Sequence, residues 1–154
     1  MLRRLDRELL VRLVEDSRAS IISLAKDIGA SRQAVAKRLE KLKRSGLVKF
    51  TAVPDSKALG LSLKAYILVR ISSDAESRAR FEAKVKRMKQ LSQVHYVYGR
   101  FDALVEALVR DHVELSKLVK ALHRVEGVQE TETYIVREAI KDKPMDPLLR
   151  ALKA

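Results

Sequence analysis

Residues 24–48 constrain the fold of this chain most, because their spacing encodes two short helices joined by a tight turn. The segment reads LAKDIGASRQAVAKRLEKLKRSGLV. Gly29 suits a left-handed turn, and Ser31 is a good N-cap for the helix that follows. Val35 falls where that second helix must be buried against the first. The spacing therefore predicts a helix-turn-helix.

The second helix of this motif is expected to have two different faces. Val35, Leu39 and Leu42 recur at helical spacing and share one apolar face. Gln33 and Lys37 project from the opposite face, which is rich in amide and cationic groups. Such groups pair with base edges, so this helix is predicted to read the major groove of DNA.

The net charge supports a polyanionic partner. The chain of 154 residues has a formal charge of +12 and a pI of about 10.1. Residues 1–50 carry 13 Lys and Arg against 6 Asp and Glu, whereas the remaining 104 residues carry 19 against 14. The charge density is therefore greatest around the helix-turn-helix, which favours nucleic acid. For any single Lys or Arg, a solvated surface position is an equally open interpretation.

The composition also excludes several classes of site and location. Cysteine is absent, so no disulfide, Cys-based zinc site or thiol nucleophile is available. There is no run of 18 apolar residues and no apolar core near residue 1, so we expect a cytoplasmic protein that does not contact the membrane. The lack of Asn and Trp and the 34% of charged residues resemble the composition of thermophile proteins, which gives a hypothesis about the source.

The sequence offers little support for catalysis. His95, His112 and His123 share no metal-ligand spacing. There is no glycine-rich phosphate loop and no evident Ser, His and acid constellation. We therefore expect no catalytic residues, no metal and no cofactor.

The first third of the chain is predicted to form a compact three-helix head. Leucines at helical spacing predict a first helix over residues 3–16, a second helix begins at Ser20, and a third spans residues 31–45 with Gly46 as its C-terminal cap. Pro54 and Gly60 then interrupt regular structure. We place a helix-turn-helix domain at residues 1–50 and a linker at residues 51–61.

The second half changes to a two-residue period. Alternation over residues 63–71 predicts a strand, and Phe81, Val85, Met88 and Leu91 then predict a helix. QVHYVYG and ALVEALV look like strands, residues 115–125 form a second helix, and VQETETYIV is a fourth strand. This order predicts an α+β protein with a ferredoxin-like βαββαβ domain at residues 62–140. The partly apolar second face of the sheet predicts a homodimer.

Taken together, these motifs resemble the Lrp/AsnC, or feast/famine, family of bacterial and archaeal transcription regulators over nearly the whole length. Tyr98-Gly99-Arg100-Phe101-Asp102 is similar to the family's Gly-x-x-Asp turn. Further matches lie in the head, at the end of the linker and around the last helix-strand junction: Leu5-Asp6, Asp16-Ser17-Arg18, Leu24-Ala25, Ile28-Gly29, Ser31, Val35, Arg38-Leu39, Leu42, Gly46-Leu47-Val48, Leu59-Gly60, Val125-Glu126-Gly127-Val128, Thr131 and Thr133. The resemblance implies a DNA-binding head, an effector-binding domain known as RAM, and assembly as dimers and often as octamers.

The candidate DNA contacts lie on the third helix. Gln33 and Lys37 are expected to read base edges, and Ala36 can meet a thymine methyl group. Arg38 borders the buried face, so an ion pair with Asp6 is an equally good interpretation. Residues nearer the ends and flanks of the helix are expected to contact phosphates: Ser31, Arg32, Lys41 and Arg44.

The resemblance also implies a small-molecule effector, commonly an amino acid, bound between dimers near the Gly-x-x-Asp turn and the last strand. It points to Gly99, Asp102, Thr131 and Thr133, whose groups can bind an ammonium and a carboxylate. Asp111 is a candidate second acidic group. Alternatively, the glycine turn only shapes a hairpin and the threonines only favour strand structure.

Two other functions and the C-terminal tail stay open. Sirohaem decarboxylases share the two-domain shape, and an architectural protein would bind DNA through charge alone. In the tail, residues 141–154, Asp146 and Pro147 are predicted to cap and start a short helix with a stripe of leucines. We expect this stripe to dock on a neighbouring subunit, with a frayed terminus as the alternative.

Overall fold

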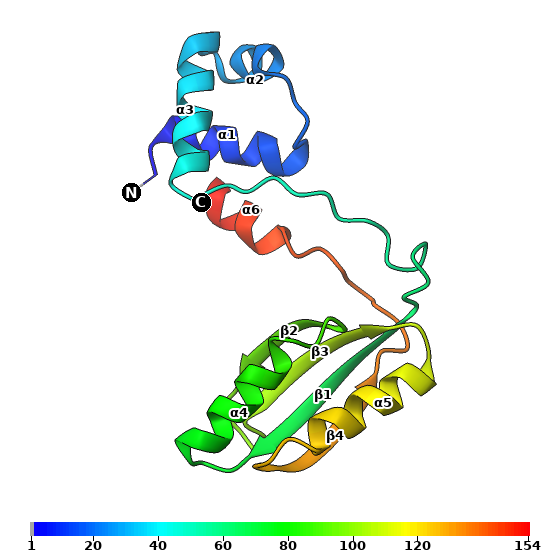
Figure 1. The fold of residues 1–154 in the computed structure, drawn as a ribbon. Coiled ribbons are helices and arrows are strands. Elements are labelled where there is room, and N and C mark those ends of the chain that lie inside the picture. The colour runs from blue at the N-terminus through cyan, green and yellow to red at the C-terminus, as the bar shows by residue number, and fades with distance from the viewer. Residues whose placement is uncertain (1) are drawn as a thin grey trace. The chain divides into compact units, whose positions relative to one another are not determined.

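The computed structural model describes residues 2–154 and divides the chain into two compact units. The head unit contains the chain up to Val53 together with Ile140–Ala154, and the sheet unit is Pro54–Ala139. Figure 1 shows that the first unit consists of helices, the C-terminal one among them, and that the second is a sheet covered by helices. This is the expected α+β organisation, a helical head followed by a βαββαβ domain.

The head is built from three short helices around leucine and valine side chains. They are α1 (Arg4–Glu15), α2 (Ile21–Ile28) and α3 (Arg32–Arg44). Their inward faces form one apolar cluster, in which the residues exposed by less than 2% are Leu9, Leu24 and Val35. The three helices begin and end within a residue or two of the predicted positions.

The turn between α2 and α3 depends on backbone chemistry that the sequence predicted. Gly29 has φ +69°, a left-handed conformation that glycine adopts without steric cost, and its N–H donates to carbonyl oxygens at the end of α2. The Ser31 hydroxyl then accepts from the Ala34 N–H at 3.2 Å, which caps α3. These two residues set the direction in which α3 leaves the turn.

The C-terminal tail forms the predicted helix, and one of its leucines packs on the head of the same chain. Helix α6 (Asp146–Lys153) contains Pro147 in its first turn, as predicted, whereas Met145 rather than Asp146 is the N-cap and makes no side-chain cap bond. Leu152 packs against the apolar cluster of the head of the same chain, and Lys153 pairs with Glu15 at 3.1 Å. Leu152 is therefore covered by the head of its own chain, whereas Leu148 stays exposed, and docking of the tail on a neighbouring subunit stays a prediction.

The sheet unit has the predicted strand and helix order. Its elements are β1 (Leu63–Ile71), α4 (Ala75–Val85), β2 (Leu91–Tyr96), β3 (Ala103–Val109), α5 (His112–His123) and β4 (Val128–Ile135). The four strands lie in the order β2-β3-β1-β4, and every neighbouring pair is antiparallel. This arrangement is the ferredoxin-like sheet.

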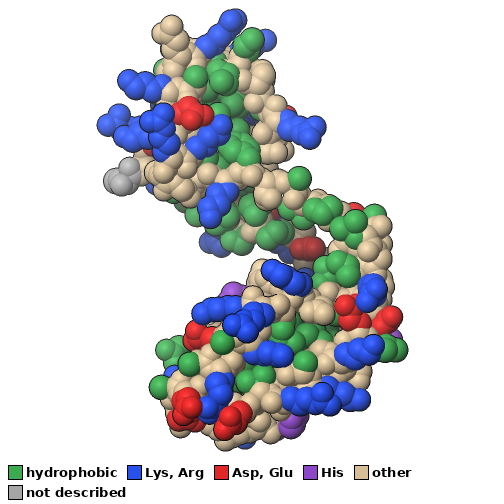
Figure 2. All heavy atoms as spheres, in the orientation of Figure 1, with side chains coloured by type: hydrophobic (Ala, Val, Ile, Leu, Met, Phe, Trp, Pro, Cys, Tyr) green, Lys and Arg blue, Asp and Glu red, His purple; other side chains and the backbone are tan. Residues whose placement is uncertain are grey.

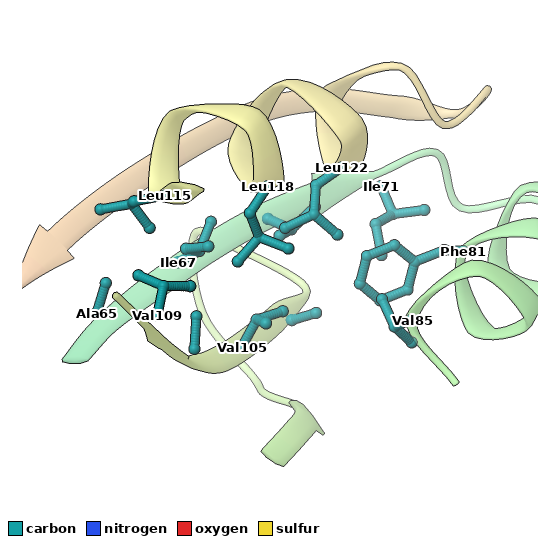
Figure 3. Packing of buried hydrophobic residues seen from close by; sticks show 13 residues of the cluster. Ala65, Ile67, Ile71, Phe81, Val85, Val105, Val109, Leu115, Leu118 and Leu122 are labelled. Carbon is teal, nitrogen blue, oxygen red and sulfur yellow. The ribbon is translucent and has the colours of Figure 1, made fainter. Parts of the chain in front are cut away.

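The main core lies between the sheet and its two helices. Side chains alternate between the two faces of a strand, and one face of β1 and β3 packs against α4 and α5. Every second residue of these strands is therefore almost completely buried. Figure 3 shows Leu115, Leu118 and Leu122 of α5 above Ile67 of β1, with the Phe81 ring of α4 near Ile71. The core therefore fixes which face of each strand remains outside.

Two helix ends differ from the predicted ones. Met88 and Leu91 continue the helical spacing of α4, but α4 ends at Val85, and Leu91 begins β2. Val125 likewise lies beyond the end of α5 at His123. Met88, Leu91 and Val125 all pack against the core from a turn or a strand. The spacing therefore predicts burial correctly at these positions, but not backbone conformation.

Candidate functional site

Helix α3 and its N-cap hold every residue that we expected to contact DNA. Val35 and Leu42 are buried in the head, which fixes the orientation of the helix about its axis. Ala36 is half-buried beside them. The remaining candidates are exposed on the outer side of α3 or at its start: Ser31, Arg32, Gln33, Lys37, Lys41 and Arg44.

Arg38 is a structural residue, because both ends of its guanidinium bind Asp6 of α1. Its Nε donates to Asp6 Oδ1 and its Nη2 donates to Asp6 Oδ2. Asp6 is only 1% exposed and also accepts from the Arg3 N–H at 3.0 Å. Hydrogen bonding from Arg38 holds the pKa of the Asp6 carboxyl below its usual value. The ion-pair interpretation of Arg38 is confirmed, and the pair joins α3 to α1.

The outer face of α3 keeps its positive charges available. Within residues 2–154, Arg32, Lys37, Lys41 and Arg44 form no ion pair, whereas Lys43 pairs with Glu40 at 3.2 Å. Figure 2 shows Lys and Arg side chains gathered over this part of the head. A capped helix with an amide and unpaired cations on its exposed face has the chemistry to contact both bases and phosphates.

In the sheet unit, Asp102 has a structural role in the turn between β2 and β3. Its N–H donates to the Val69 carbonyl at 3.0 Å, and its Oδ2 accepts from the Ile71 N–H at 2.8 Å. This bond lies where the β1–β4 register shifts, between Arg70 and Ile71. Asp102 therefore satisfies a backbone donor at the irregular end of β1, which is part of the hairpin-shaping interpretation.

Two arginines and a glutamate hold the same turn in place. The Arg70 and Arg100 guanidinium groups lie 5.7 and 5.2 Å from the centre of the buried Phe101 ring. Arg100 donates to Glu130 of β4 at 3.0 Å, and Arg70 pairs with Glu130 at 3.5 Å. The turn is thus linked to β1 and β4 by charged contacts.

The strand register decides which of the expected effector residues come together. Ala103, Val69 and Thr131 lie opposite one another across β3, β1 and β4, so Thr131 lies at the same end of the sheet as Asp102. Thr133 lies two residues further along β4, opposite Ile67. Gly99 lies in the exposed turn, with φ +152°. The structure therefore places Gly99, Asp102 and Thr131 toward one end of the sheet, whereas Thr133 lies level with the middle of β1.

Asp111 does not join this group. It follows β3 at the opposite end of the sheet, so the length of β3, roughly 20 Å at about 3.4 Å per residue, separates it from Asp102. Its Oδ1 accepts from the Glu114 N–H at 2.7 Å and caps α5. It lines a separate groove of about 430 Å³ with Arg110, Lys117 and Met88.

Tyr98 is a candidate functional residue that was not among those predicted from the sequence. Its side chain is fully exposed in the turn that precedes Gly99. Phe101 and Asp102 of the same turn contact other parts of the sheet unit, whereas the Tyr98 ring is fully exposed, so it is a candidate contact for another molecule. Its place inside the Gly-x-x-Asp turn was the available signal.

Within the described part of the chain, residues 2–154, no cluster of three His, Cys, Asp or Glu side chains is arranged to hold a metal ion. No helix in those residues is long and apolar enough to cross a bilayer.

Comparison with known proteins decides the family. Residues 64–146 match the Lrp/AsnC ligand-binding domain, and residues 2–49 match a winged helix-turn-helix DNA-binding domain. The chain belongs to the Lrp/AsnC family. It is therefore a DNA-binding transcription regulator with a ligand-binding RAM domain, and not an enzyme of the sirohaem decarboxylase kind.

Similar proteins agree with this assignment over most of the chain. An uncharacterized transcriptional regulator of Pyrococcus horikoshii is 30% identical over 90% of this chain and 93% of its own. The leucine-responsive regulatory protein of Escherichia coli is 32% identical over 90% of this chain and 86% of its own. A transcriptional regulator of Neisseria meningitidis, solved as a complex with L-Met, has a TM-score of 0.87 at 27% identity and covers 97% of this chain and 100% of its own.

Proposed function

We propose that this Lrp/AsnC regulator reads specific DNA sites with α3 and that an amino acid alters its DNA affinity or its assembly. The observation that carries the proposal is the exposed face of α3, which bears Gln33 and several unpaired cations. Gln33 and Lys37 contact base edges, and Ala36 meets a thymine methyl group. The residues that contact phosphates are Ser31, Arg32, Lys41 and Arg44.

The proposed effector site lies at the Asp102 end of the sheet. Asp102 Oδ2 is engaged by the Ile71 N–H, and a carboxylate has further acceptor positions for an ammonium group. Gly99 and the threonines Thr131 and Thr133 offer a backbone N–H and hydroxyl groups for a carboxylate. The L-Met complex of the Neisseria protein supports an amino acid as the ligand. Asp111 would reach the same ligand only from another subunit.

The outer face of the sheet supports a homodimer. Leu68 and Leu104 lie opposite each other on that face, flanked by Tyr66 and Tyr134, and Tyr134 is 52% exposed. Burying such a surface against its copy removes apolar area from water at about 25 cal/mol per Å². We propose a dimer through this face, which can assemble further to an octamer, and a site of action in the cytoplasm, where the genome lies.

Selection of bound duplexes from a random pool tests both domains together. With the full chain, we expect enrichment of a pseudo-palindromic site whose half-sites lie about one helical turn, or a multiple of it, apart. A panel of amino acids that includes L-methionine should change the yield or the spacing. An unenriched pool would contradict specific reading and favour an architectural protein, and an unchanged result with every amino acid would contradict the effector assignment.

A further inference from the structure

The sheet unit carries its own local surplus of positive charge. The twelve residues from Arg78 to Lys89 contain six Lys and Arg and one acid, Glu82. The whole unit, Pro54–Ala139, contains 15 Lys and Arg against 12 Asp and Glu, so the rest of it is slightly acidic. The surplus therefore belongs to α4 and to the turn that follows it.

Most of these charges are not neutralised by neighbours. Arg80 pairs with Glu76 at 2.6 Å, and Lys86 pairs with Glu82 at 3.1 Å. The other four are exposed and form no ion pair within residues 2–154: Arg78, Lys84, Arg87 and Lys89. Figure 2 shows Lys and Arg side chains on the face of this unit that α4 and α5 cover. We call these four residues the α4 basic surface.

Three cations, two of α4 and one of the turn after it, also border a shallow hollow. Arg80 and Lys84 lie one turn apart on one side of the helix, and Arg87 follows in the turn after Val85. With Ala83 and Met88 they line a groove of about 390 Å³. Like charges at this spacing repel each other by a few tenths of a kcal/mol per pair, and an anion in the groove would remove that repulsion.

We propose that the α4 basic surface is a second, sequence-independent contact for the phosphate backbone of DNA. The proposal rests on the DNA binding of the head and adds a separate surface to it. Arg78 and Lys84 alone lie about 9 Å apart along α4, at about 1.5 Å per helical residue, and Arg87 and Lys89 follow in the next turn, so the charges suit a row of phosphates better than one compact anion. DNA held by the head of the same chain is also present at high effective concentration.

The test compares matched double variants of the full chain on two duplexes. Lys84→Gln with Arg87→Gln removes two charges from the basic surface, and Gln retains helix propensity. Lys57→Gln with Arg137→Gln removes the same two residue types from exposed positions elsewhere in the unit. One duplex spans only the two half-sites, about 20 base pairs, and the other carries the same site within long flanking DNA.

The wild type and the control should bind the longer duplex more tightly than the short one, whereas the α4 variant should lose this gain. For the longer duplex, the slope of log K against log salt should become shallower by about 0.9 for each phosphate that the variant no longer neutralises. Base preference on the short duplex should not change.

Two results would overturn the proposal. One is an α4 variant that keeps both the flanking-DNA gain and the wild-type salt slope. The other is saturable binding of pyrophosphate by the wild type, abolished in the α4 variant, with no effect on the flanking-DNA gain, which would assign the groove to a compact anion. If the first variant does not fold, Arg78→Gln with Lys89→Gln removes the other two charges of the surface and serves the same comparison.

Discussion

At the scale of single residues, Lys37 and Lys41 lie one turn apart on the exposed side of α3, yet we expect their substitutions to differ in effect. Lys37→Ala should reduce discrimination at particular base positions by about 1–3 kcal/mol, because alanine cannot bind a base edge as the ammonium group does. Lys41→Ala should weaken all duplexes similarly. Dissociation constants for the selected site and for a scrambled duplex measure both effects. An equal weakening on the two duplexes for Lys37→Ala would reject its base-reading role.

The Asp6–Arg38 pair should make the stability of the head depend on pH. Hydrogen bonds from Arg38 lower the pKa of Asp6 in the folded state below its usual 3.8. A depressed carboxyl pKa contributes stability that is present above the unfolded pKa and is lost as the pH falls through the folded pKa. Thermal melts should therefore show the head weakening below about pH 4.

Asp6→Asn should lower the melting temperature at pH 7 and abolish this part of the acid dependence, because Asn keeps the shape but not the charge. Asp27→Asn, at an exposed position of α2, is the matched control and should melt like the wild type at pH 7. Identical acid profiles for the wild type and Asp6→Asn would show that the pair is not linked to stability.

Gly127 is constrained twice, by conformation and by space. Its φ is +92°, and a Cβ at this position would lie 2.3 Å from the Ser77 side chain of α4. Gly127→Ala should therefore destabilise the sheet unit by about 2 kcal/mol or more, measured by denaturant unfolding. Gly60→Ala meets the left-handed conformation with no atom within 4 Å, so it should cost less. Equal costs would mean that the contact with Ser77 relaxes.

At the scale of elements, α6 belongs to the stability of the head. Leu152 packs against the head cluster, whereas Leu148 of the same helix is 54% exposed. Leu152→Asp should lower the melting temperature of the head, because it buries a charge at an apolar contact, and Leu148→Asp should have little effect. Calorimetry of the full chain measures both. A melt unchanged by Leu152→Asp would mean that α6 contributes nothing to the head.

The elements show what local sequence determines. Helices α2 and α3 were predictable because Ser20, Gly29 and Ser31 provide caps and a turn that act within four residues. The end of α4 was not, because Met88 and Leu91 are partly buried like helix residues although a turn and a strand carry them. The spacing of apolar residues shows which residues are buried. That spacing can continue through a short turn although the backbone is no longer helical.

The candidate sites divide in the same way. The exposed face of α3 follows from one helix and its period, so the sequence sufficed. The effector residues depend on strand register instead. The bond from Ile71 to Asp102 joins residues 31 positions apart, and the opposite location of Asp111 follows from the direction of β3. Strand register and strand direction cannot be predicted from a local sequence pattern. The contact of Leu152 with the head cluster could not be predicted either, because it joins the two ends of the chain.

At the scale of the whole molecule, composition and charge set the expectations that single elements cannot. A thermophilic source stays a prediction, and a melting temperature within about 45–65 °C, the range of mesophile domains, would count against it.

The two basic surfaces, on α3 and on α4, belong to different units of one chain. They therefore bind one DNA molecule at separate points if the proposed contact exists, which makes affinity depend on DNA length.

Because α6 returns to the head, two chain segments join the units, one after Val53 and one before Ile140. A protease that cuts only the first segment would leave two fragments with no covalent bond between them, yet α6 would still fasten the larger one to α1 through Leu152 and the Lys153–Glu15 pair. The nicked protein should elute as one species in gel filtration, and nicked Leu152→Asp should fall apart. Recovery of a free N-terminal fragment from the nicked wild type would refute this. If the nicked protein stays together, α6 is a second, non-covalent connection between the units. A cut in the linker would then not separate the DNA-binding domain from the ligand-binding domain.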